Sequence, residues 1–384
     1  MKFSVLLPTR NRIELLRHAV ESVRMQDYAD WEIVISDNAS DEDVAGFAAS
    51  FGDARIRYSR TDRFLPVTEN WSRALEQSSG DYLIMLGDDD ALMPGCLSTA
   101  HQLIGSWGAP DAIYTQALQY AYPGVIPGNG QGFIQTGFNA FLGDADRPFL
   151  LERGVAENMV SAAMSFHVQY GFNMQHFIIS RRLVKALAEK GPFFQSPYPD
   201  YYAANVILLE AKSILAYPLP LVMIGISPKS FGYYYHNKRE NEGVEFLQNL
   251  VSEDMQMRLS KTLVPGTNMN DSWLVAMETI RQNFPERQLR VNYRRYRLLQ
   301  YYAVLRAQYV KGILPVLSSM RLWEIILYAP LVLFYAVASA LPEAIGRKLK
   351  NRMFASLSGF PSFDPRRVTV PHRDIIEAVR AHNA

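Results

Sequence analysis

The sequence predicts an α/β fold, with a mostly parallel sheet, flanking helices and a helical C-terminal extension. Short apolar runs of strand length alternate with segments of helical periodicity over the first 115 residues or so. Polar residues follow several of these strands directly. From about residue 240 the sequence pattern indicates long helices, and the residues become increasingly basic. Alternation of strands and helices is typical of parallel sheets with right-handed crossovers.

Most of the expected strands are short apolar runs that end at a turn residue, and the expected helices carry apolar residues three or four positions apart. The helix over 12–26, for example, places Ile13, Leu16, Val20 and Val23 on one face. In chain order we expect strands at 3–7, 31–36, 55–58, 82–86, 111–115 and 175–179, and helices at 12–26, 41–51, 69–77, 181–190 and 201–211. Residues 116–155 are rich in glycine and proline and are expected to form a long loop near the site.

Length and composition fit a large first domain over 1–238 and a helical, basic and apolar region over 239–384. The formal net charge of +1 gives no reason to expect a nucleic-acid partner. Cys96 is the single cysteine, which excludes an intrachain disulfide and fits a reducing cytosol. The first residues run straight into an apolar strand without the features of a signal peptide, so we expect a cytoplasmic protein.

The most informative stretch is the apolar strand 82–86, which runs into Gly87, Asp88, Asp89 and Asp90. Three adjacent carboxylates are costly to bury unless they face water or a cation, and hard divalent ions prefer oxygen ligands. The alternative is an acidic turn that caps a helix starting near Pro94. Residues 8–11 and 37–38 also follow strands, so in a parallel sheet all three groups would meet at one edge.

Three segments carry a resemblance to family 2 glycosyltransferases. Residues 3–12 resemble the family's opening strand and turn, 31–41 its second strand with an aspartate turn, and 80–94 its metal-site segment. The resemblance covers roughly residues 1–115. It implies a GT-A fold (Rossmann-like), a nucleotide-diphospho-sugar donor, Mg²⁺ or Mn²⁺, and a saccharide or lipid-linked saccharide as acceptor.

The resemblance also implies roles for individual residues. Asp89 is expected to be the principal metal ligand, with Asp88 near the ribose and the metal, and Asp90 nearer the sugar or acceptor. The family usually has an aspartate where this chain has Gly87, which leaves the division of labour among the three open. His236 is a further candidate for the metal or the diphosphate, and the alternative is a structural or exposed histidine.

Other residues are expected to bind the nucleotide. Asp37 resembles the residue that accepts a hydrogen bond from the donor's base, and its alternative role is a helix cap. Pro8 and Thr9 would contact the base and ribose through their backbone. The candidates Arg10, Asn11 and Arg63 would face the nucleotide; Arg10, Asn11 and the adjacent Arg12 could instead be solvent-facing turn residues, and Arg63 a solvated loop arginine.

An inverting transferase needs a base that takes the proton of the acceptor hydroxyl. In the family this is an Asp or Glu just before a helix in the second half of the domain, and Asp200 is the candidate. Its competing role is an ordinary N-cap for the helix 201–211. Glu210 and Glu157 are weaker alternatives.

The C-terminal region has an apolar segment among basic and aromatic residues. Residues 325–341 carry no charge and would span about 25 Å as a helix, less than the ~30 Å of a bilayer core. We interpret 287–352 as a membrane-associated hairpin or interfacial helix, at the inner face of the cell membrane. The alternative is an apolar helix buried against the catalytic domain or against a second subunit of a homo-oligomer.

The leading hypothesis is an inverting sugar transferase in polysaccharide, O-antigen or glycolipid biosynthesis. A sugar nucleotidyltransferase would share the fold, but it carries a glycine-rich loop after its first strand, and residues 8–11 contain no glycine. A non-catalytic nucleotide-sugar-binding or membrane scaffold protein is the third hypothesis.

Overall fold

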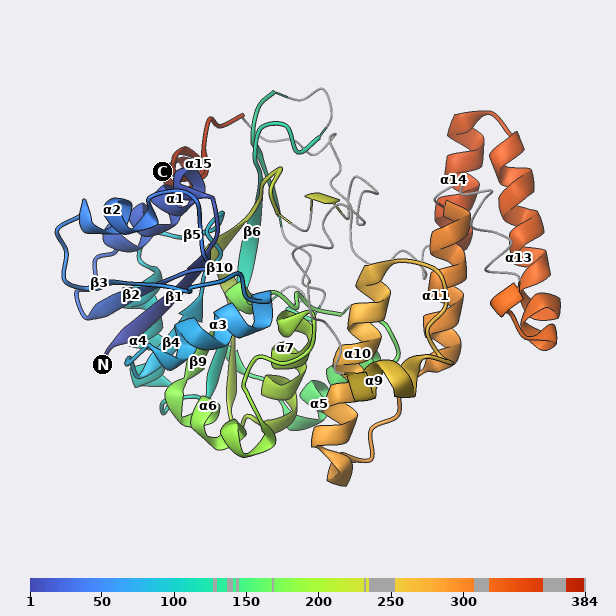
Figure 1. Cartoon of the computed structure of the whole chain (residues 1–384), viewed down its shortest axis with the longest axis horizontal. Helices are drawn as coiled ribbons and strands as arrows, with labels where there is room; N and C mark the ends of the chain where they lie inside the picture. Colours follow the sequence, from blue (N-terminus) through green and yellow to red (C-terminus); the bar gives the residue numbers. More distant parts are fainter. Residues whose placement is uncertain are drawn as a thin grey trace.

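The computed structural model describes residues 1–126, 130–136, 141–142, 145–167, 169–230, 233–234, 253–306, 318–354 and 371–382. A single twisted sheet with helices on both faces forms the larger part of the molecule, and a group of helices extends from one side of it (Figure 1). Within the described residues the sheet has ten strands, in the order β3-β2-β1-β4-β9-β6-β10-β5, with β7 beside β6 and β8 beside β10. The predicted α/β class with a helical C-terminal extension is confirmed.

The strands are β1 (Phe3–Thr9), β2 (Trp31–Asp37), β3 (Ile56–Arg60), β4 (Tyr82–Met85), β5 (Ala91–Leu92), β6 (Ala112–Ala121), β7 (Phe133–Thr136), β8 (Phe149–Leu150), β9 (Phe177–Ser180) and β10 (Ile214–Ile226). The α-helices are α1 (Ile13–Arg24), α2 (Val44–Ala49), α3 (Val67–Glu76), α4 (Cys96–Ser106), α5 (Arg153–Met164), α6 (Arg181–Leu187), α7 (Pro199–Glu210), α9 (Glu253–Leu259), α10 (Asn268–Asn283), α11 (Tyr293–Arg306), α13 (Leu322–Ala340), α14 (Glu343–Phe354) and α15 (Ile375–His382). A short 3₁₀ turn, η1 (Met174–His176), precedes β9.

The first four predicted strands pair in parallel, as expected from their crossover helices. β1 lies between β2 and β4, and β3 adds to the outer side of β2. Successive side chains of β1 point to opposite faces, so Val5 and Leu7 pack under α1 while Leu6 packs on the other side of the sheet. Burial on both faces explains why β1, β2 and β4 are largely apolar, whereas β3 at the edge of the sheet is only partly buried.

Two expectations for the middle of the chain were wrong. Residues 116–155 are not one long loop, because β6 continues to Ala121, β7 and β8 follow, and α5 begins at Arg153. The thirteen-residue β10 was not predicted, because Pro218 and Pro220 interrupt its apolar pattern. Its pairing with β6 shifts register on both sides of Pro220, which accommodates a residue that cannot donate to the ladder.

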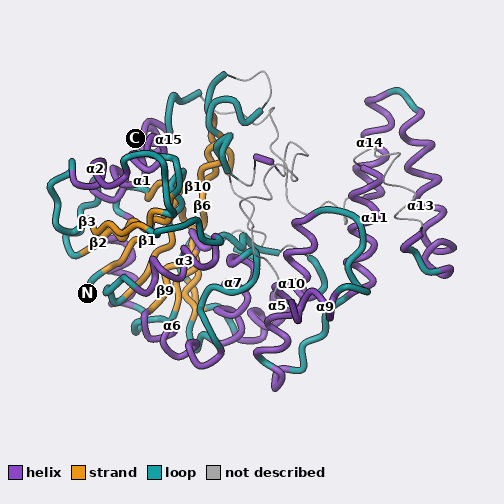
Figure 2. Tube along the Cα trace, viewed as in Figure 1, coloured by secondary structure: helices purple, strands orange, loops and turns teal. Residues whose placement is uncertain are grey.

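The C-terminal region is not wholly separate from the sheet. The indole Nε1 of Trp273 on α10 donates to the carbonyl oxygen of Ala163 on α5 at 3.0 Å, and one apolar core runs from the sheet through α7 into α10 and α11. The hairpin α13–α14 lies at the far side of α11, whereas α15 returns to pack on α1 (Figures 1 and 2). The predicted boundary at 238/239 lies outside the described residues, so the division of the chain into two domains stays a prediction.

Candidate functional site

Three strand ends meet at one edge of the sheet, as the sequence predicts. Thr9 at the end of β1 is opposite Asp37 at the end of β2, and its carbonyl accepts from the backbone N–H of Asn38 at 2.9 Å. The Thr9 hydroxyl donates to Oδ2 of Asp88, just after β4, at 2.8 Å. The carboxyl ends of β1, β2 and β4 therefore lie side by side at one edge of the sheet, where Thr9 contacts both Asn38 and Asp88.

Asp88 forms a buried ion pair with Arg12. The Nη1 of Arg12 donates to Asp88 Oδ1 at 2.9 Å, and its Nη2 donates to the carbonyl oxygen of Lys229. Burial acts to lower the pKa of Arg12, but the charges of Asp88 and Asp89 outweigh it and raise that pKa. The expectation that Arg12 is a solvent-facing turn residue was wrong, because a guanidinium beside two buried carboxylates has a strong electrostatic reason to be buried with them.

Asp89 faces β10 rather than β1. Its Oδ2 accepts from the Ser227 hydroxyl at 3.0 Å, and its backbone carbonyl accepts from the Tyr122 hydroxyl at 3.1 Å. Burial and the neighbouring charge of Asp88 raise the pKa of Asp89 to about 6, although Arg12 and Ser227 act in the opposite direction. The ionised form of Asp89 is therefore costly here, and added positive charge would stabilise it.

Asp90 turns back into the protein. Its Oδ2 accepts from the Gly87 N–H and from Gln175 Nε2, both at 2.7 Å, and its Oδ1 accepts from the Gly225 N–H at 2.8 Å. Burial and the charge of Asp89 raise its pKa well above the ordinary value. The carboxylate of Asp90 occupies the space beside Gly87, where an added Cβ would lie 2.6 Å from Oδ2. This close approach is a steric reason for glycine at a position where the family usually has aspartate.

The three carboxylates thus have different neighbours, which bears on whether a divalent ion fits. No group of three His, Cys, Asp or Glu side chains in the described part of the chain is arranged to hold a metal. The donor chemistry nevertheless suits Mg²⁺ or Mn²⁺, because carboxylate oxygens are hard ligands and Mg²⁺ is often held by one or two of them together with substrate phosphates. Asp89 fits such a set best, since both oxygens of Asp88 and both oxygens of Asp90 already accept hydrogen bonds from neighbouring groups. Asp88, which lies at the ends of the parallel strands, is the second candidate.

Asp37 is buried and held by its own neighbours. Its Oδ1 accepts from the Ser40 N–H at 3.0 Å, and its Oδ2 accepts from the Tyr58 hydroxyl at 2.9 Å. It does not cap α2, whose N-terminus is capped by Asp43. Binding of a base by Asp37 stays a prediction, and it would require the base to share or replace one of these donors.

The remaining nucleotide candidates lie around the same edge with different exposure. Pro8 is buried in β1, the guanidinium of Arg10 lies 4.1 Å from the ring centre of Phe64, and Arg63 is exposed in the loop before α3. Asn11 adopts a left-handed conformation and exchanges two hydrogen bonds with Asp41. His236 lies outside the described residues. The ligand roles of all of these residues stay predictions.

Asp200 lies in the first turn of α7, and the expectation that it could be the N-cap was wrong. The N-cap is Tyr198, and Asp200 Oδ1 instead accepts from the Met174 N–H at 2.8 Å. Met174 and Gln175 are consecutive residues of η1, so one turn holds both Asp200 and Asp90. Desolvation raises the pKa of Asp200 to about 7. The weaker candidates are paired elsewhere, Glu210 with Arg287 and Glu157 with Arg153.

Four residues of this site were not predicted from the sequence, and all contact the aspartates from distant parts of the chain. They are Arg12, Gln175, Gly225 and Ser227. Periodicity cannot reveal such partners, because each is a single polar residue or glycine brought in by the sheet order. Position 225 also has a steric reason to be glycine, since an added Cβ would lie 1.8 Å from the carbonyl oxygen of Asp89.

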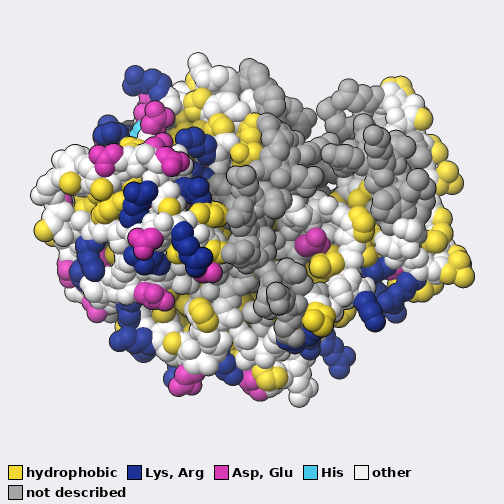
Figure 3. Space-filling model, in the orientation of Figure 1, with side chains coloured by type: hydrophobic (Ala, Val, Ile, Leu, Met, Phe, Trp, Pro, Cys, Tyr) yellow, Lys and Arg dark blue, Asp and Glu magenta, His cyan; other side chains and the backbone are white. Residues whose placement is uncertain are grey.

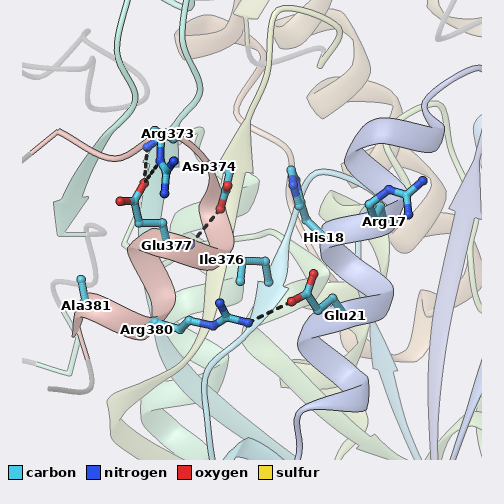
Figure 4. A pocket seen from close by; sticks show the side chains of 9 residues that line it. All are labelled: Arg17, His18, Glu21, Arg373, Asp374, Ile376, Glu377, Arg380 and Ala381. Atoms are coloured by element: carbon cyan, nitrogen blue, oxygen red, sulfur yellow. Dashed lines mark hydrogen bonds and ion pairs between the residues drawn. The ribbon is translucent and has the colours of Figure 1, made fainter.

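A cavity also lies elsewhere, between α1 and α15. It measures about 580 Å³, and its lining includes Arg17, His18 and Glu21 on one side and Arg373, Glu377 and Arg380 on the other (Figure 4). Arg380 donates to Glu21 at 2.9 Å across it. The aspartates after β4 do not line this cavity, and its walls mix both signs of charge.

The fold and the converging strand ends define an α/β protein whose ligand edge lies at the carboxyl ends of parallel strands. Residues 4–130 match the family model described as Glycosyl transferase family 2. This match covers the part of the chain that carries the resemblance to family 2 glycosyltransferases, and the resemblance inferred from the sequence is confirmed.

Curated relatives match over the same region. The GalNAc(5)-diNAcBac-PP-undecaprenol beta-1,3-glucosyltransferase of Campylobacter jejuni is 38% identical over 104 residues, which cover 26% of this chain and 34% of that protein. A PGL/p-HBAD biosynthesis glycosyltransferase of Mycobacterium bovis is 30% identical over 121 residues, covering 30% of this chain and 46% of its own. The chain thus matches well under two thirds of the length of these relatives.

Solved structures resemble the chain over most of its length at low sequence identity. TarS 1–349 of S. aureus, solved with UDP-GlcNAc, is 13% identical and covers 100% of this chain and 92% of its own, with a TM-score of 0.49. The mannosyltransferase PcManGT of Pyrobaculum calidifontis, solved with GDP-Man and Mn²⁺, is 14% identical and covers 92% and 84%, with a TM-score of 0.42.

Proposed function

We propose that this protein transfers a sugar, with inversion, from a nucleotide-diphospho-sugar to an acceptor hydroxyl. The match of residues 4–130 to the glycosyltransferase family 2 model supports the reaction class. The observation that carries the proposal is the single turn η1, which holds Asp90 through Gln175 and Asp200 through the Met174 N–H. A carboxylate that can accept a proton is thereby fixed near the strand ends where the donor is proposed to bind.

In the proposed reaction, Asp200 acts as general base. It accepts the proton of the acceptor hydroxyl as that oxygen forms a bond to the anomeric carbon. The bond from the same carbon to the diphosphate oxygen breaks, and the nucleoside diphosphate leaves with the electron pair. A carboxylate with a pKa of about 7 suits this role, because a base works best when its pKa is close to the operating pH.

The donor is proposed to lie along the edge formed by Thr9, Asp37 and Asp88. Mg²⁺ or Mn²⁺ held by Asp88 and Asp89 would offset the charge that the leaving diphosphate develops. Arg12 pairs with Asp88 and orients its carboxylate at this edge. We assign this chemistry to the proposed domain 1–238.

The acceptor class is proposed from the relatives. The Campylobacter relative is named for a saccharide carried on PP-undecaprenol, and the mycobacterial relative for PGL biosynthesis. A saccharide on a lipid carrier is therefore our proposed acceptor, within polysaccharide or glycolipid biosynthesis.

The test is turnover of a panel of nucleotide sugars in the presence of Mn²⁺. We expect one donor to raise the Tm and to be hydrolysed or transferred, and we expect chelation with EDTA to abolish the reaction. Asp89→Asn should lower kcat about 10²–10³-fold, since it removes a carboxylate that would hold the cation at the leaving group. Asp146→Asn, at a carboxylate whose side chain is 86% exposed, should leave kcat unchanged. Donor binding without any turnover by the wild type would favour the non-catalytic scaffold instead.

A further inference from the structure

Helix α13 is apolar on two opposite faces. One face packs on the protein through Tyr328 and Ala338, which are 7% and 2% exposed. The opposite face carries Leu322, Ile326, Leu333 and Val337, which are 76%, 69%, 67% and 56% exposed. At 100° per residue these four lie within about 60° of one another, so they form one continuous stripe. We call these four residues the α13 stripe.

A helix on the surface of a water-soluble protein normally carries polar residues opposite its buried face. Residues 325–341 contain no charged residue, so the exposed face of α13 lacks charged side chains from Ile325 onward. Among the described helices α13 is the one long and apolar enough to cross a membrane, and a quarter of its apolar window is buried in the protein. Hydrophobic side chains gather along the side of α13 that faces away from the molecule (Figure 3). Such a contiguous apolar surface indicates a binding partner.

The second helix of the hairpin adds positive charge beside this apolar surface. On α14, Ile345 and Leu349 lie four residues apart and are 54% and 37% exposed. Lys348 and Arg352, both exposed, occupy the same side of the helix by their spacing. Exposed apolar residues with flanking lysine and arginine are typical of a helix that lies in a membrane interface.

The charge balance of the hairpin is one-sided. Residues 318–354 contain five basic residues and two acidic ones, Glu324 and Glu343. Glu324 is fully buried and accepts from Arg297 Nε at 2.5 Å and from the backbone N–H of Arg321 at 2.8 Å. It therefore offers no negative charge to a partner. A second copy of the hairpin would bring like charges together, whereas an anionic surface would complement them.

The start of α13 has further features of a membrane interface. The guanidinium of Arg294 lies 5.5 Å from the ring centre of Trp323, which is 39% exposed. Tryptophan is enriched where a protein meets the headgroup region. The Arg297–Glu324 pair fixes this end of α13 to α11, so the α13 stripe is held in place on the folded protein.

We propose that the α13–α14 hairpin docks on an anionic lipid bilayer, with the α13 stripe in the interface and Lys348 and Arg352 at the headgroups. A transmembrane span fits less well, because one face of α13 is packed on protein and Pro330 lies inside the helix. This inference does not depend on the chemistry at Asp89 and Asp200.

The test is flotation of the full chain with vesicles of phosphatidylcholine and phosphatidylglycerol, compared with vesicles of phosphatidylcholine alone. We expect the protein to float with the anionic vesicles and high salt to weaken this binding. Ile326→Asp combined with Leu333→Asp should lower the bound fraction at least tenfold. Lys348→Glu combined with Arg352→Glu should lower binding to anionic vesicles about tenfold or more, since each basic residue near such a surface contributes about 1 kcal/mol.

Matched controls separate docking from general damage. Met257→Asp changes a residue of α9 that is 76% exposed, and Arg373→Glu reverses a charge that is 89% exposed, and neither should change flotation. All variants should keep the wild-type Tm. Wild type that stays in the aqueous fraction would overturn the proposal. So would a lipid-free dimer that Ile326→Asp dissociates while vesicle binding is absent, because the stripe would then be a surface for self-association.

Discussion

Carboxylates are buried at both ends of the central strands, but their pKa values are shifted in opposite directions. At the amino end, Glu32 accepts from Lys2 Nζ at 2.8 Å, the Ser4 hydroxyl at 2.7 Å and the Ser79 N–H at 2.5 Å. Desolvation acts to raise its pKa, yet these hydrogen bonds outweigh it and lower the pKa to about 2. At the carboxyl end, burial dominates and raises the pKa of Asp89 to about 6.

The two ends of the sheet therefore have different roles in stability and in the proposed reaction. A carboxylate with a full set of donors stabilises the ionised native state, so Glu32 serves the fold. Carboxylates whose desolvation is not fully offset by hydrogen bonds or positive charge lower the stability of the native state when they are ionised. Such groups are common at functional sites. One sheet therefore holds a stability site and a proposed reaction site at opposite ends of the same strands.

The largest effect is expected at the carboxyl end. Asp200→Asn should lower kcat by about 10²–10⁴-fold, because it removes the proposed base while keeping the shape of the side chain. In the wild type, kcat/KM should rise as the pH rises through about 7, since only the ionised carboxylate accepts a proton. This rise should disappear in the variant.

Glu210→Gln at the other end of α7 is the matched control and should keep both the rate and the pH profile. If Asp200→Asn lowers donor affinity and Tm as much as kcat, Asp200 is a structural residue, and the comparison between the two ends fails.

A smaller effect, on stability, is expected at the amino end. Glu32→Gln should lower the free energy of unfolding by about 2 kcal/mol, near the low end for a broken buried pair because its partners Lys2 and Arg57 are 36% and 49% exposed. The folded pKa is depressed, so the wild-type advantage is present above about pH 4.5 and is lost as the pH falls towards 2.

Urea unfolding across this pH range measures the difference, with Glu76→Gln at an exposed position of α3 as the control. If Asp89→Asn lowers the free energy of unfolding more than Glu32→Gln does, the amino end is not the end that contributes more to stability, and the assignment of roles to the two ends is wrong.

The smallest effect tests the space beside Asp90. Gly87→Ala would place a Cβ 2.6 Å from Asp90 Oδ2 and should lower the free energy of unfolding by about 1 kcal/mol through overpacking. Gly105→Ala in α4 meets nothing within 4 Å and should instead raise stability by about 0.5–1 kcal/mol. Thermal unfolding of the two variants provides the measurement. Equal shifts in Tm for both variants would mean that Asp90 is not held against Gly87.

The parts of this molecule that could be predicted are those with a local pattern. β1, β2 and β4 are short, largely apolar runs followed by polar turns, and the parallel order of β1, β2, β3 and β4 follows from the helices between them. That order alone predicts that Thr9, Asp37 and Asp88 share an edge. β10 could not be predicted, because its two prolines interrupt the apolar pattern of a strand. Only the pairing with β6, which the local sequence does not encode, identifies it as a strand.

The details of the site depend on contacts that no local pattern carries. The sequence suggested Asp200 as the base, with an N-cap as its competing role, but it could not reveal that Asp200 accepts from the N–H of Met174, which lies 26 residues away. Ser227 reaches Asp89 across 138 residues, and Gln175 reaches Asp90 across 85. The carboxylates could be named in advance, whereas the groups that set their protonation could not.

Helix α15 has a consequence for the order in which the protein is built. It packs on α1, and Arg380 pairs with Glu21 across 359 residues of chain. On a ribosome the strands of the sheet emerge before the helix that covers α1. The surface that receives Ile375, Ile376 and Val379 includes residues of β6 and β10, so a nascent chain has an unprotected apolar surface from the synthesis of β10 until that of α15.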